Sequence, residues 1–281
     1  MSPEGRVYGP FPVAATAAAV ADFVAATGDD PGRWSGHAPP AFASVALFAV
    51  APVFLADPGM AVAGGALLHS EQTFRWHGPL AVGESAAVRG GVTSIRERGP
   101  LRLVGLEVEA ETTAGRWFEG RSTLVMSSAV AGAVAEEAEP GTEESAANDP
   151  LGPVPITPGG GPVPPLRRSA SRADLVRYAG ATRDWNPIHW DHDAARAAGF
   201  GGIVVHGLLM VAWLAQTAAR HSPGPHPLHS LRTRFRGPLR PGVQAVVAGE
   251  AGTADHDGVP LDLRLSAGGD PLVTATVIVT P

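Results

Sequence analysis

Residues 207–219 read GLLMVAWLAQTAA, a stretch that would be apolar almost all round if it formed a helix. A helix without a polar face is expected to lie inside a protein. Residues 42–55 form a second stretch of this kind in the first half of the chain. The sequence therefore predicts two buried helices, one in each half.

The same predicted elements surround each buried helix. An amphipathic helix comes before it, and in the second half Ser171 can cap that helix together with Asp174. Four candidate strands follow each buried helix, over residues 68–77, 84–95, 101–112 and 116–126, and then over residues 229–237, 243–251, 259–267 and 271–280. This repeat predicts an α+β architecture in which an antiparallel sheet wraps around a central helix, twice in one chain.

The composition changes sharply between the two halves. Residues 128–164 are first acidic and then rich in proline and glycine, with almost no aromatic content. Such a segment cannot bury enough apolar surface to offset its ordering entropy. We therefore expect an N-terminal unit over residues 1–127, a linker over residues 128–164 and a C-terminal unit over residues 165–281.

The overall composition excludes several kinds of chemistry. The chain has 281 residues and no cysteine, and all 21 of its basic residues are arginine. Disulfides, thiolate metal sites, Schiff-base catalysis and a P-loop lysine are thereby excluded. The net charge of -6 argues against nucleic acid as the main partner. We expect a cytoplasmic protein without membrane association, because no signal peptide is evident and prolines interrupt the apolar stretch at residues 38–55.

The densest group of polar side chains follows the predicted amphipathic helix of the second half. Residues 183–193 read RDWNPIHWDHD, and Pro187 both ends the helix and holds Asn186 extended. Asp184 and His189 then lie on one constrained loop, as proton transfer at neutral pH requires. Gly207 begins the second buried helix, where its unpaired N–H can bind a ligand oxygen. This set predicts acid–base chemistry beside a carbonyl such as that of a thioester.

Residues 179–207, AGATRDWNPIHWDHDAARAAGFGGIVVHG, resemble the MaoC-like (R)-specific enoyl thioester hydratases and dehydratases. The signature of that family is Asp-x-Asn-Pro-x-His, followed further on by His-Gly. Its counterparts here are Asp184, Asn186, Pro187, His189, His206 and Gly207. The first half, through LLHSEQTFRWHGPLAVGE and GRSTLVM, is similar to the FAS1-like dehydratase domain of these proteins but lacks Asn-Pro-x-His.

The resemblance implies a double hotdog fold and a hydro-lyase with one active site per chain. Asp184 and His189 would hold a water and move protons in the reversible syn hydration of a trans-2-enoyl thioester. The Gly207 N–H would polarise the thioester carbonyl, and Asn186 and Pro187 would support the loop. The N-terminal unit would be non-catalytic and would shape the acyl channel. Substrates would be thioesters of coenzyme A or acyl carrier protein, without metal or organic cofactor, and a homodimer is compatible with this scheme.

Some residues of the motif region have alternative interpretations. His189, Asp191, His192 and Asp193 could hold a metal, but the further ligands of a metallo-hydrolase motif are absent, so we expect none. His206 could be a third catalytic group, although we favour a supporting role in which its ring nitrogens bond backbone groups near the helix start.

Other polar residues lie outside the motif. Arg232, Arg234 and Arg236 alternate along a predicted strand and so share one face. They could contact coenzyme A phosphates or an acidic carrier protein, or they could form a solvated strand face. His69 and His77 are interpreted as strand and turn positions rather than as a second site.

Two other functions remain open from the sequence. A hotdog acyl thioesterase would use the same carboxylate or imidazole to direct water at the thioester carbonyl. A non-catalytic acyl-binding subunit would keep the pocket and leave the chemistry to a partner chain.

Overall fold

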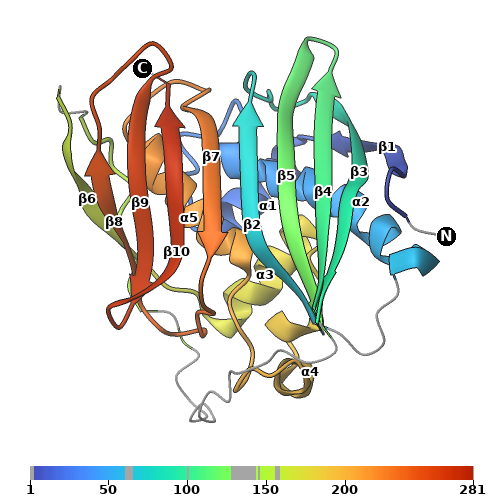
Figure 1. The fold of residues 1–281 in the computed structure, drawn as a ribbon. Coiled ribbons are helices and arrows are strands. Elements are labelled where there is room, and N and C mark those ends of the chain that lie inside the picture. Colours follow the sequence, from blue (N-terminus) through green and yellow to red (C-terminus); the bar gives the residue numbers. More distant parts are fainter. Residues whose placement is uncertain are drawn as a thin grey trace.

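The structure, a computed structural model, describes residues 3–60, 66–99, 101–127, 144, 146–155 and 159–280. Within these residues the strands form one antiparallel sheet in the order β1-β3-β4-β5-β2-β7-β10-β9-β8-β6 (Figure 1). The first half supplies β1 (Val7–Ala14), α1 (Ala17–Thr27), α2 (Ala43–Leu55), β2 (Ala66–Trp76), β3 (Ser85–Arg98), β4 (Leu101–Thr112) and β5 (Gly115–Ser127). The second half supplies β6 (Gly161–Arg168), α3 (Arg172–Thr182), α4 (His192–Ala197), α5 (Gly207–Ala219), β7 (Leu228–Phe235), β8 (Ala245–Ala251), β9 (Val259–Ala267) and β10 (Asp270–Val279).

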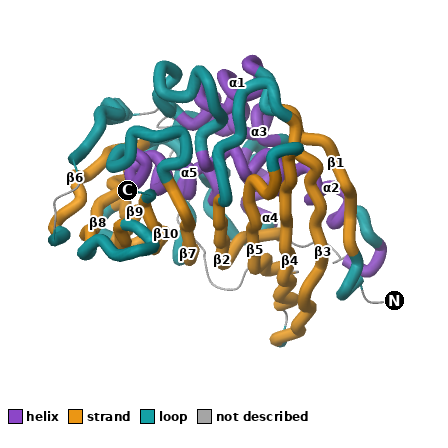
Figure 2. Tube along the Cα trace, turned by 90° about the horizontal axis from the view of Figure 1, so that it is seen from above, coloured by secondary structure: helices purple, strands orange, loops and turns teal. Residues whose placement is uncertain are grey.

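The two halves repeat one arrangement and share one sheet. In each half a strand, an amphipathic helix, an apolar helix and four further strands follow one another, and the apolar helix lies against the sheet. The second half has the short α4 in addition, between α3 and α5. β2 of the first half pairs with β7 of the second, with Glu71 opposite Arg234 and Arg75 opposite Ser230. Seen from above, the helices lie on one side of the curved sheet (Figure 2). This is the α+β double hotdog that the sequence predicts.

The two central helices form the core of each half. Every residue of α5 from 208 to 219 is buried, and α5 packs against β7, β8, β9 and β10. α2 packs against β1, β3 and β4 in the same way. The buried position of α5 explains the absence of a polar stripe on this helix. In α2 the end of the helix is exposed, with Val53 at 45% and Leu55 at 40%, so the prediction that this helix is buried throughout is wrong for its last turn.

The two amphipathic helices pack against each other where the halves meet. Thr16 caps α1 by accepting a hydrogen bond from the Ala19 N–H, and Ser171 and Asp174 form the predicted capping box of α3. The predicted apolar faces are the buried ones, namely Val20, Phe23, Val24 and Thr27 on α1 and Leu175, Tyr178, Ala179 and Thr182 on α3.

Two edge strands were not predicted from the sequence. β1 contains Pro10 and Pro12, and β6 contains Pro162, Pro164 and Pro165. Proline cannot donate to a strand ladder and is tolerated at sheet edges, which is where both strands lie.

β6 begins inside the segment expected as a linker. Asn148 and Asp149, also in that segment, hydrogen-bond to Ser169 and Arg167. Residues 128–143, 145 and 156–158 of the expected linker lie outside the described residues. Among the described residues, no helix combines the length and the apolar character that crossing a bilayer requires.

Candidate active site

A left-handed residue at the end of α3 directs Asp184 into the protein. Among the described residues, Arg183 is the one non-glycine residue with a positive φ, at 67°. It ends the helix four residues before Pro187, so the prediction that Pro187 ends the helix is wrong, and Pro187 instead begins a short 3-10 helix. The next backbone N–H, that of Asp184, donates to the Thr182 hydroxyl at 3.3 Å. Asp184 is only 9% exposed. The turn therefore places a carboxyl group where it is almost fully shielded from solvent.

His189 lies one turn further on, at the end of a short 3-10 helix, Pro187–His189. It is buried, and its Nδ1 lies 2.8 Å from the Val204 carbonyl oxygen. Since a carbonyl only accepts, Nδ1 carries the proton and Nε2 is left with its lone pair. The imidazole is therefore held in the tautomer that can accept a proton at Nε2.

Asn186 holds the loop between these two residues. Its side-chain oxygen accepts from the Ile188 N–H, and its own N–H points at Asp184 Oδ1 at 3.4 Å. Its Nδ2 donates to the Leu67 carbonyl on β2 at 3.1 Å. The loop of the second half is thereby tied to a strand of the first half.

His206 and Gly207 face this loop from the start of α5. His206 is fully buried, its ring stacks on that of His189 with centroids 3.8 Å apart, and its Nε2 lies 3.3 Å from the Asp184 carbonyl oxygen. The Gly207 N–H is the first of the helix and has no intrahelical acceptor. A Cβ on Gly207 would lie only 3.1 Å from Phe235 Cε1, so glycine permits close packing here.

The three polar side chains converge. One carboxyl oxygen of Asp184 and one ring nitrogen each of His189 and His206 lie within 4.8 Å of one another. A water that hydrogen-bonds at about 2.8 Å can bridge groups at this separation.

The same three side chains offer atoms close enough together to be considered as metal ligands. The two imidazoles stack with their planes 24° apart, and each has one nitrogen at a backbone carbonyl. The other residues of the metal interpretation are engaged elsewhere, because Asp191 caps α4 and Asp193 pairs with Arg196 at 3.0 Å.

Burial shifts both members of the Asp184–His189 pair toward neutrality. It raises the pKa of the Asp184 carboxyl to about 7, against the opposing hydrogen bond from the Asn186 N–H. Burial, with a smaller contribution from the nearby His69 imidazole, lowers the pKa of His189 to about 4, against the opposing hydrogen bond to the Val204 carbonyl. At neutral pH the site therefore holds a neutral imidazole beside a carboxyl that exchanges its proton readily.

The first half carries a partial counterpart of this loop. α1 ends in a left-handed Gly28, with φ at 64°, followed by Asp29, as α3 ends in Arg183 followed by Asp184. Trp34 lies at the same separation in sequence from Asp29 as His189 lies from Asp184, and it is buried. The counterpart therefore keeps a carboxyl group and lacks the imidazole.

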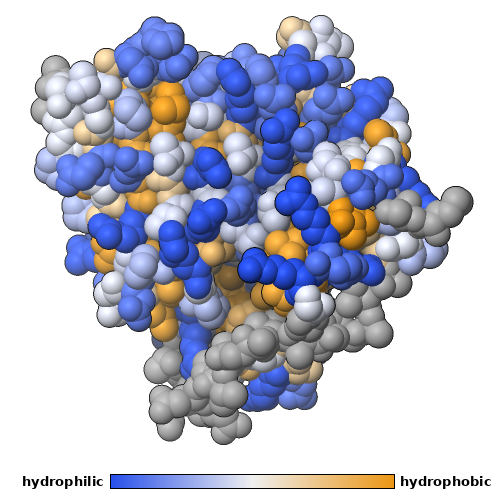
Figure 3. All heavy atoms as spheres, viewed as in Figure 1, coloured by the Kyte–Doolittle hydropathy of each residue, from blue (hydrophilic) through white to orange (hydrophobic). Residues whose placement is uncertain are grey.

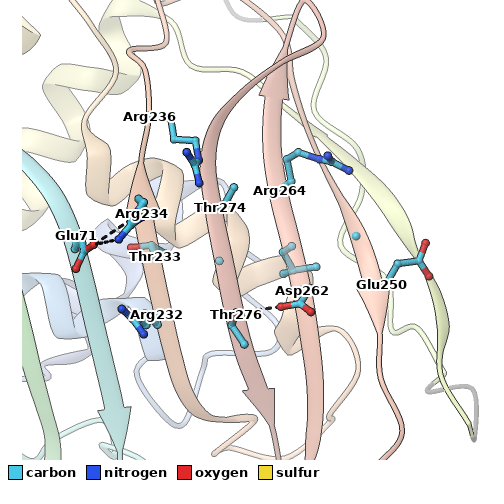
Figure 4. Close-up of a pocket in the computed structure, with 13 residues that line it drawn as sticks. Glu71, Arg232, Thr233, Arg234, Arg236, Glu250, Asp262, Arg264, Thr274 and Thr276 are labelled. Carbon is cyan, nitrogen blue, oxygen red and sulfur yellow. Dashed lines mark hydrogen bonds and ion pairs between the residues drawn. The ribbon is translucent and has the colours of Figure 1, made fainter.

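The remaining candidates lie apart from this cluster. Arg232, Arg234 and Arg236 line a groove on the outer face of the sheet, together with residues such as Glu71 and Asp262 (Figure 4). Arg234 pairs with Glu71 at 2.6 Å. The outer face as a whole is largely hydrophilic, with smaller hydrophobic areas between the charges (Figure 3).

The arginines and the loop that carries Asp184 and His189 lie on opposite sides of the sheet. Thr233 and Phe235, which alternate with the arginines on β7, point the other way, toward the helices. Any contact of these arginines with a coenzyme A or carrier-protein ligand therefore stays a prediction.

The two histidines of the first half differ in their surroundings. His77 follows β2 and lies 3.7 Å from Glu119 at the surface. His69 lies on β2 beside the candidate site, with its ring centroid 6.1 Å from that of Phe235. The sequence carried no signal for this proximity, because the two segments are far apart along the chain.

Comparison with known proteins agrees with the fold and the motif. A family model described as "MaoC like domain" matches residues 153–257, and one described as "FAS1-like, dehydratase domain region" matches residues 4–117. The chain therefore carries a FAS1-like dehydratase region in its first half and a MaoC-like domain in its second half.

Solved structures share this fold across the whole chain. A "MaoC-like dehydratase" superposes with a TM-score of 0.79 at 24% identity, covering 99% of this chain and 98% of the other. A Mycobacterium tuberculosis protein described as having a double hotdog fold superposes with a TM-score of 0.63 at 16% identity, covering 99% and 96%.

Curated relatives match over shorter stretches. A mitochondrial 3-hydroxyacyl-[acyl-carrier-protein] dehydratase of Arabidopsis thaliana is 40% identical over 57 residues, which are 20% of this chain and 34% of the relative. An (R)-specific enoyl-CoA hydratase of Rhodospirillum rubrum is 28% identical over 78 residues, 27% of this chain and 54% of the relative. The chain thus spans about a third to a half of the length of these relatives.

Proposed function

We propose that this chain is a hydro-lyase that adds water reversibly to trans-2-enoyl thioesters. In the other direction it would dehydrate (3R)-hydroxyacyl thioesters. The observation that carries the proposal is the convergence of Asp184 and His189 within 4.8 Å, at the start of a helix whose first N–H is unpaired. The thioester would be that of coenzyme A or of acyl carrier protein, by analogy with the names of the relatives.

The first step of hydration would use the pair to activate water. A water bound between Asp184 and His189 loses a proton to the pair, and its oxygen adds to C3 of the enoyl group. Electrons from the C2–C3 double bond then move onto the thioester oxygen. General acid–base assistance of this kind contributes roughly 10²- to 10⁴-fold in rate.

The second step would return the proton to the substrate. The Gly207 N–H and the positive end of α5 stabilise the enolate oxygen, a contribution of about 10²- to 10³-fold for one such donor. The enolate then takes a proton at C2 from the same pair. Because hydroxyl and proton arrive from one side, the addition is syn, and the enzyme returns to its starting protonation state.

The test is hydration of crotonyl-CoA by the purified chain, followed by loss of the enoyl thioester absorbance. We expect Asp184→Asn and His189→Ala to lose at least about 10²-fold in kcat/KM. The matched control is Asp29→Asn, which changes the counterpart carboxyl in the first half and is expected to leave kcat/KM within about twofold.

Three results would contradict the proposal. Release of free thiol without hydration would identify a thioesterase. Binding of the thioester by a chain that neither hydrates nor hydrolyses a series of longer enoyl thioesters would identify an acyl-binding subunit. An equal loss of kcat/KM in Asp29→Asn and Asp184→Asn would show that the loop with Asp184 has no role that its counterpart in the first half lacks.

A further inference from the structure

An irregularity in β2 changes the side of the sheet toward which His69 points. Along β2, the even-numbered Gln72, Phe74 and Trp76 are buried and face the helices. Strict alternation would place His69 on the outer face. However, the register against β5 shifts between His69 and Glu71, so that Ser70 is an extra residue. The Ser70 hydroxyl donates to the Thr123 carbonyl at 3.2 Å, which stabilises the bulge.

The strand beyond the bulge therefore turns its odd-numbered residues inward. Leu67 is paired with Met126 and His69 with Leu124, and both partners on β5 are buried. Directly opposite residues of an antiparallel pair project on the same side of the sheet. Bulges commonly redirect a side chain in this way beside functional sites.

The redirected His69 lies close to two parts of the candidate active site. Two residues before it, the Leu67 carbonyl accepts the hydrogen bond from Asn186 of the proposed catalytic loop. Its ring lies 6.1 Å from that of Phe235, whose edge is 3.1 Å from the position of a Cβ on Gly207. The first half thus contributes an imidazole near both the loop and the start of α5.

One nitrogen of this imidazole has an unused hydrogen-bonding capacity. His69 Nε2 is buried, and within the part of the chain that the structure describes it has no hydrogen-bond partner. Buried polar atoms are normally paired, so an unpaired one beside a site requires an explanation, such as a ligand that supplies the partner. Burial also lowers the pKa of His69 to about 4, so the ring is neutral at pH 7 and has one N–H to donate.

We propose that His69 is a substrate-binding residue, which donates a hydrogen bond from Nε2 to the acyl thioester oxygen bound by Gly207. The inference rests on the proposed function for the identity of the ligand. It gives the first half a direct part in the site, although that half lacks the Asn-Pro-x-His loop. The enolate oxygen would then be stabilised by a donor from each half.

The kinetic test compares two substitutions at this position. His69→Leu removes the donor and keeps the bulk, whereas His69→Gln keeps an N–H donor. We expect His69→Leu to lower kcat/KM for crotonyl-CoA by about 10²-fold, mainly through kcat, and His69→Gln to recover most of the loss. His77→Leu, at the surface beyond the same strand, is the matched control and should remain within about twofold of the unsubstituted chain.

A spectroscopic test is independent of turnover. Crotonyl-CoA labelled with ¹³C at its carbonyl is bound to the Asp184→Asn variant, and the infrared stretch of the carbonyl is recorded. A hydrogen bond lowers this frequency. We expect the added His69→Leu substitution to return the frequency part of the way toward that of the free thioester, and to weaken binding. Thermal unfolding of each variant establishes that it is folded.

The outcomes separate the two proposals. Unchanged kinetics and an unchanged carbonyl frequency in folded His69→Leu would overturn the role of His69. Equal losses in His69→Leu and His69→Gln with no change in frequency would also overturn it, because they indicate packing alone. A chain that binds the thioester with a His69-dependent frequency but fails to hydrate it would support His69 and refute the proposed reaction.

Discussion

Asp184 is a carboxyl group that the fold buries and leaves with few hydrogen bonds. A carboxylate in such surroundings is costly, and its pKa rises to about 7 as a result. The same desolvation keeps His189 neutral. The pair therefore combines a proton acceptor with an acid of nearly neutral pKa, which is suited to passing one proton out and back at physiological pH.

The buried carboxyl should make Asp184→Asn more stable than the unsubstituted chain at alkaline pH. Since the pKa is raised in the folded state, the folded chain binds more protons than the unfolded chain between about pH 4 and pH 7. The contribution of Asp184 to the free energy of unfolding therefore falls as the pH rises through that range. Asparagine does not titrate, so the Asp184→Asn variant lacks this pH-dependent loss. We expect a difference on the order of 2–4 kcal/mol near pH 8 that shrinks toward zero near pH 4.

Urea unfolding of both forms at several pH values measures this difference. His189 and the other buried histidines lose stability as the pH falls below their ordinary pKa, but they do so in both forms. A constant difference between the two forms at all pH values would contradict a raised pKa for Asp184.

At the scale of elements, the loop between α3 and α4 depends on one amide side chain. Asn186 caps the short helix that ends at His189, approaches Asp184 and reaches Leu67 on β2. The loop is thus held by groups from both halves. Its geometry depends on two contacts within the motif and on one, to Leu67, that lies outside it.

Asn186→Ala should impair both stability and catalysis. Loss of the cap and of the bond to Leu67 is expected to lower the free energy of unfolding by about 1–3 kcal/mol. Movement of Asp184 and His189 is expected to lower kcat by roughly 10- to 100-fold. Urea unfolding and crotonyl-CoA hydration measure the two effects.

Asp191→Ala is the matched control for this substitution. Asp191 caps α4 by accepting from the Asp193 and Ala194 N–H groups, so its loss should cost about 1 kcal/mol. Its kcat should stay within about twofold of the unsubstituted chain. A fall in kcat equal to that of Asn186→Ala would indicate that any destabilisation of the loop region, rather than this amide, reduces activity.

At the scale of the whole molecule, the two halves form one structure. The β2–β7 pairing continues the sheet across them, the Thr233 hydroxyl donates to the Gln72 carbonyl, and Gln216 of α5 donates to the Thr27 carbonyl of α1. These buried hydrogen bonds join the two halves. If the halves separated, their donors and acceptors would be left unpaired, which costs free energy.

The chain should therefore unfold in a single cooperative transition. The first half contains Trp34, Trp76 and Trp117, and the second half contains Trp185, Trp190 and Trp213. One variant has the first set replaced by phenylalanine, and a second variant has the second set replaced. In each variant, tryptophan fluorescence reports on the half that keeps its tryptophans, and far-ultraviolet circular dichroism reports on the whole chain. We expect the two probes to give the same urea midpoint within each variant. Midpoints that differ between the two probes would show that the halves unfold independently.

The sequence alone determined the elements that depend on local patterns. The two apolar helices, the capping box of Ser171 and Asp174, and the eight predicted strands all follow from periodicity and turn chemistry within short stretches. The family and the double hotdog fold were predicted in the same way, from a contiguous motif, and are confirmed. The roles of Asp184, His189 and Gly207 stay predictions, although the fold brings these residues together.

Only the tertiary structure decided the features that join distant segments. β1 and β6 are strands because they complete the edges of the sheet, in spite of their prolines. His69 faces the site because a bulge against β5 reverses the alternation of β2. Burial and cross-strand register depend on which segments lie next to one another in the folded chain. No local pattern in this sequence predicts that β2, β7 and the loop after α3 lie together.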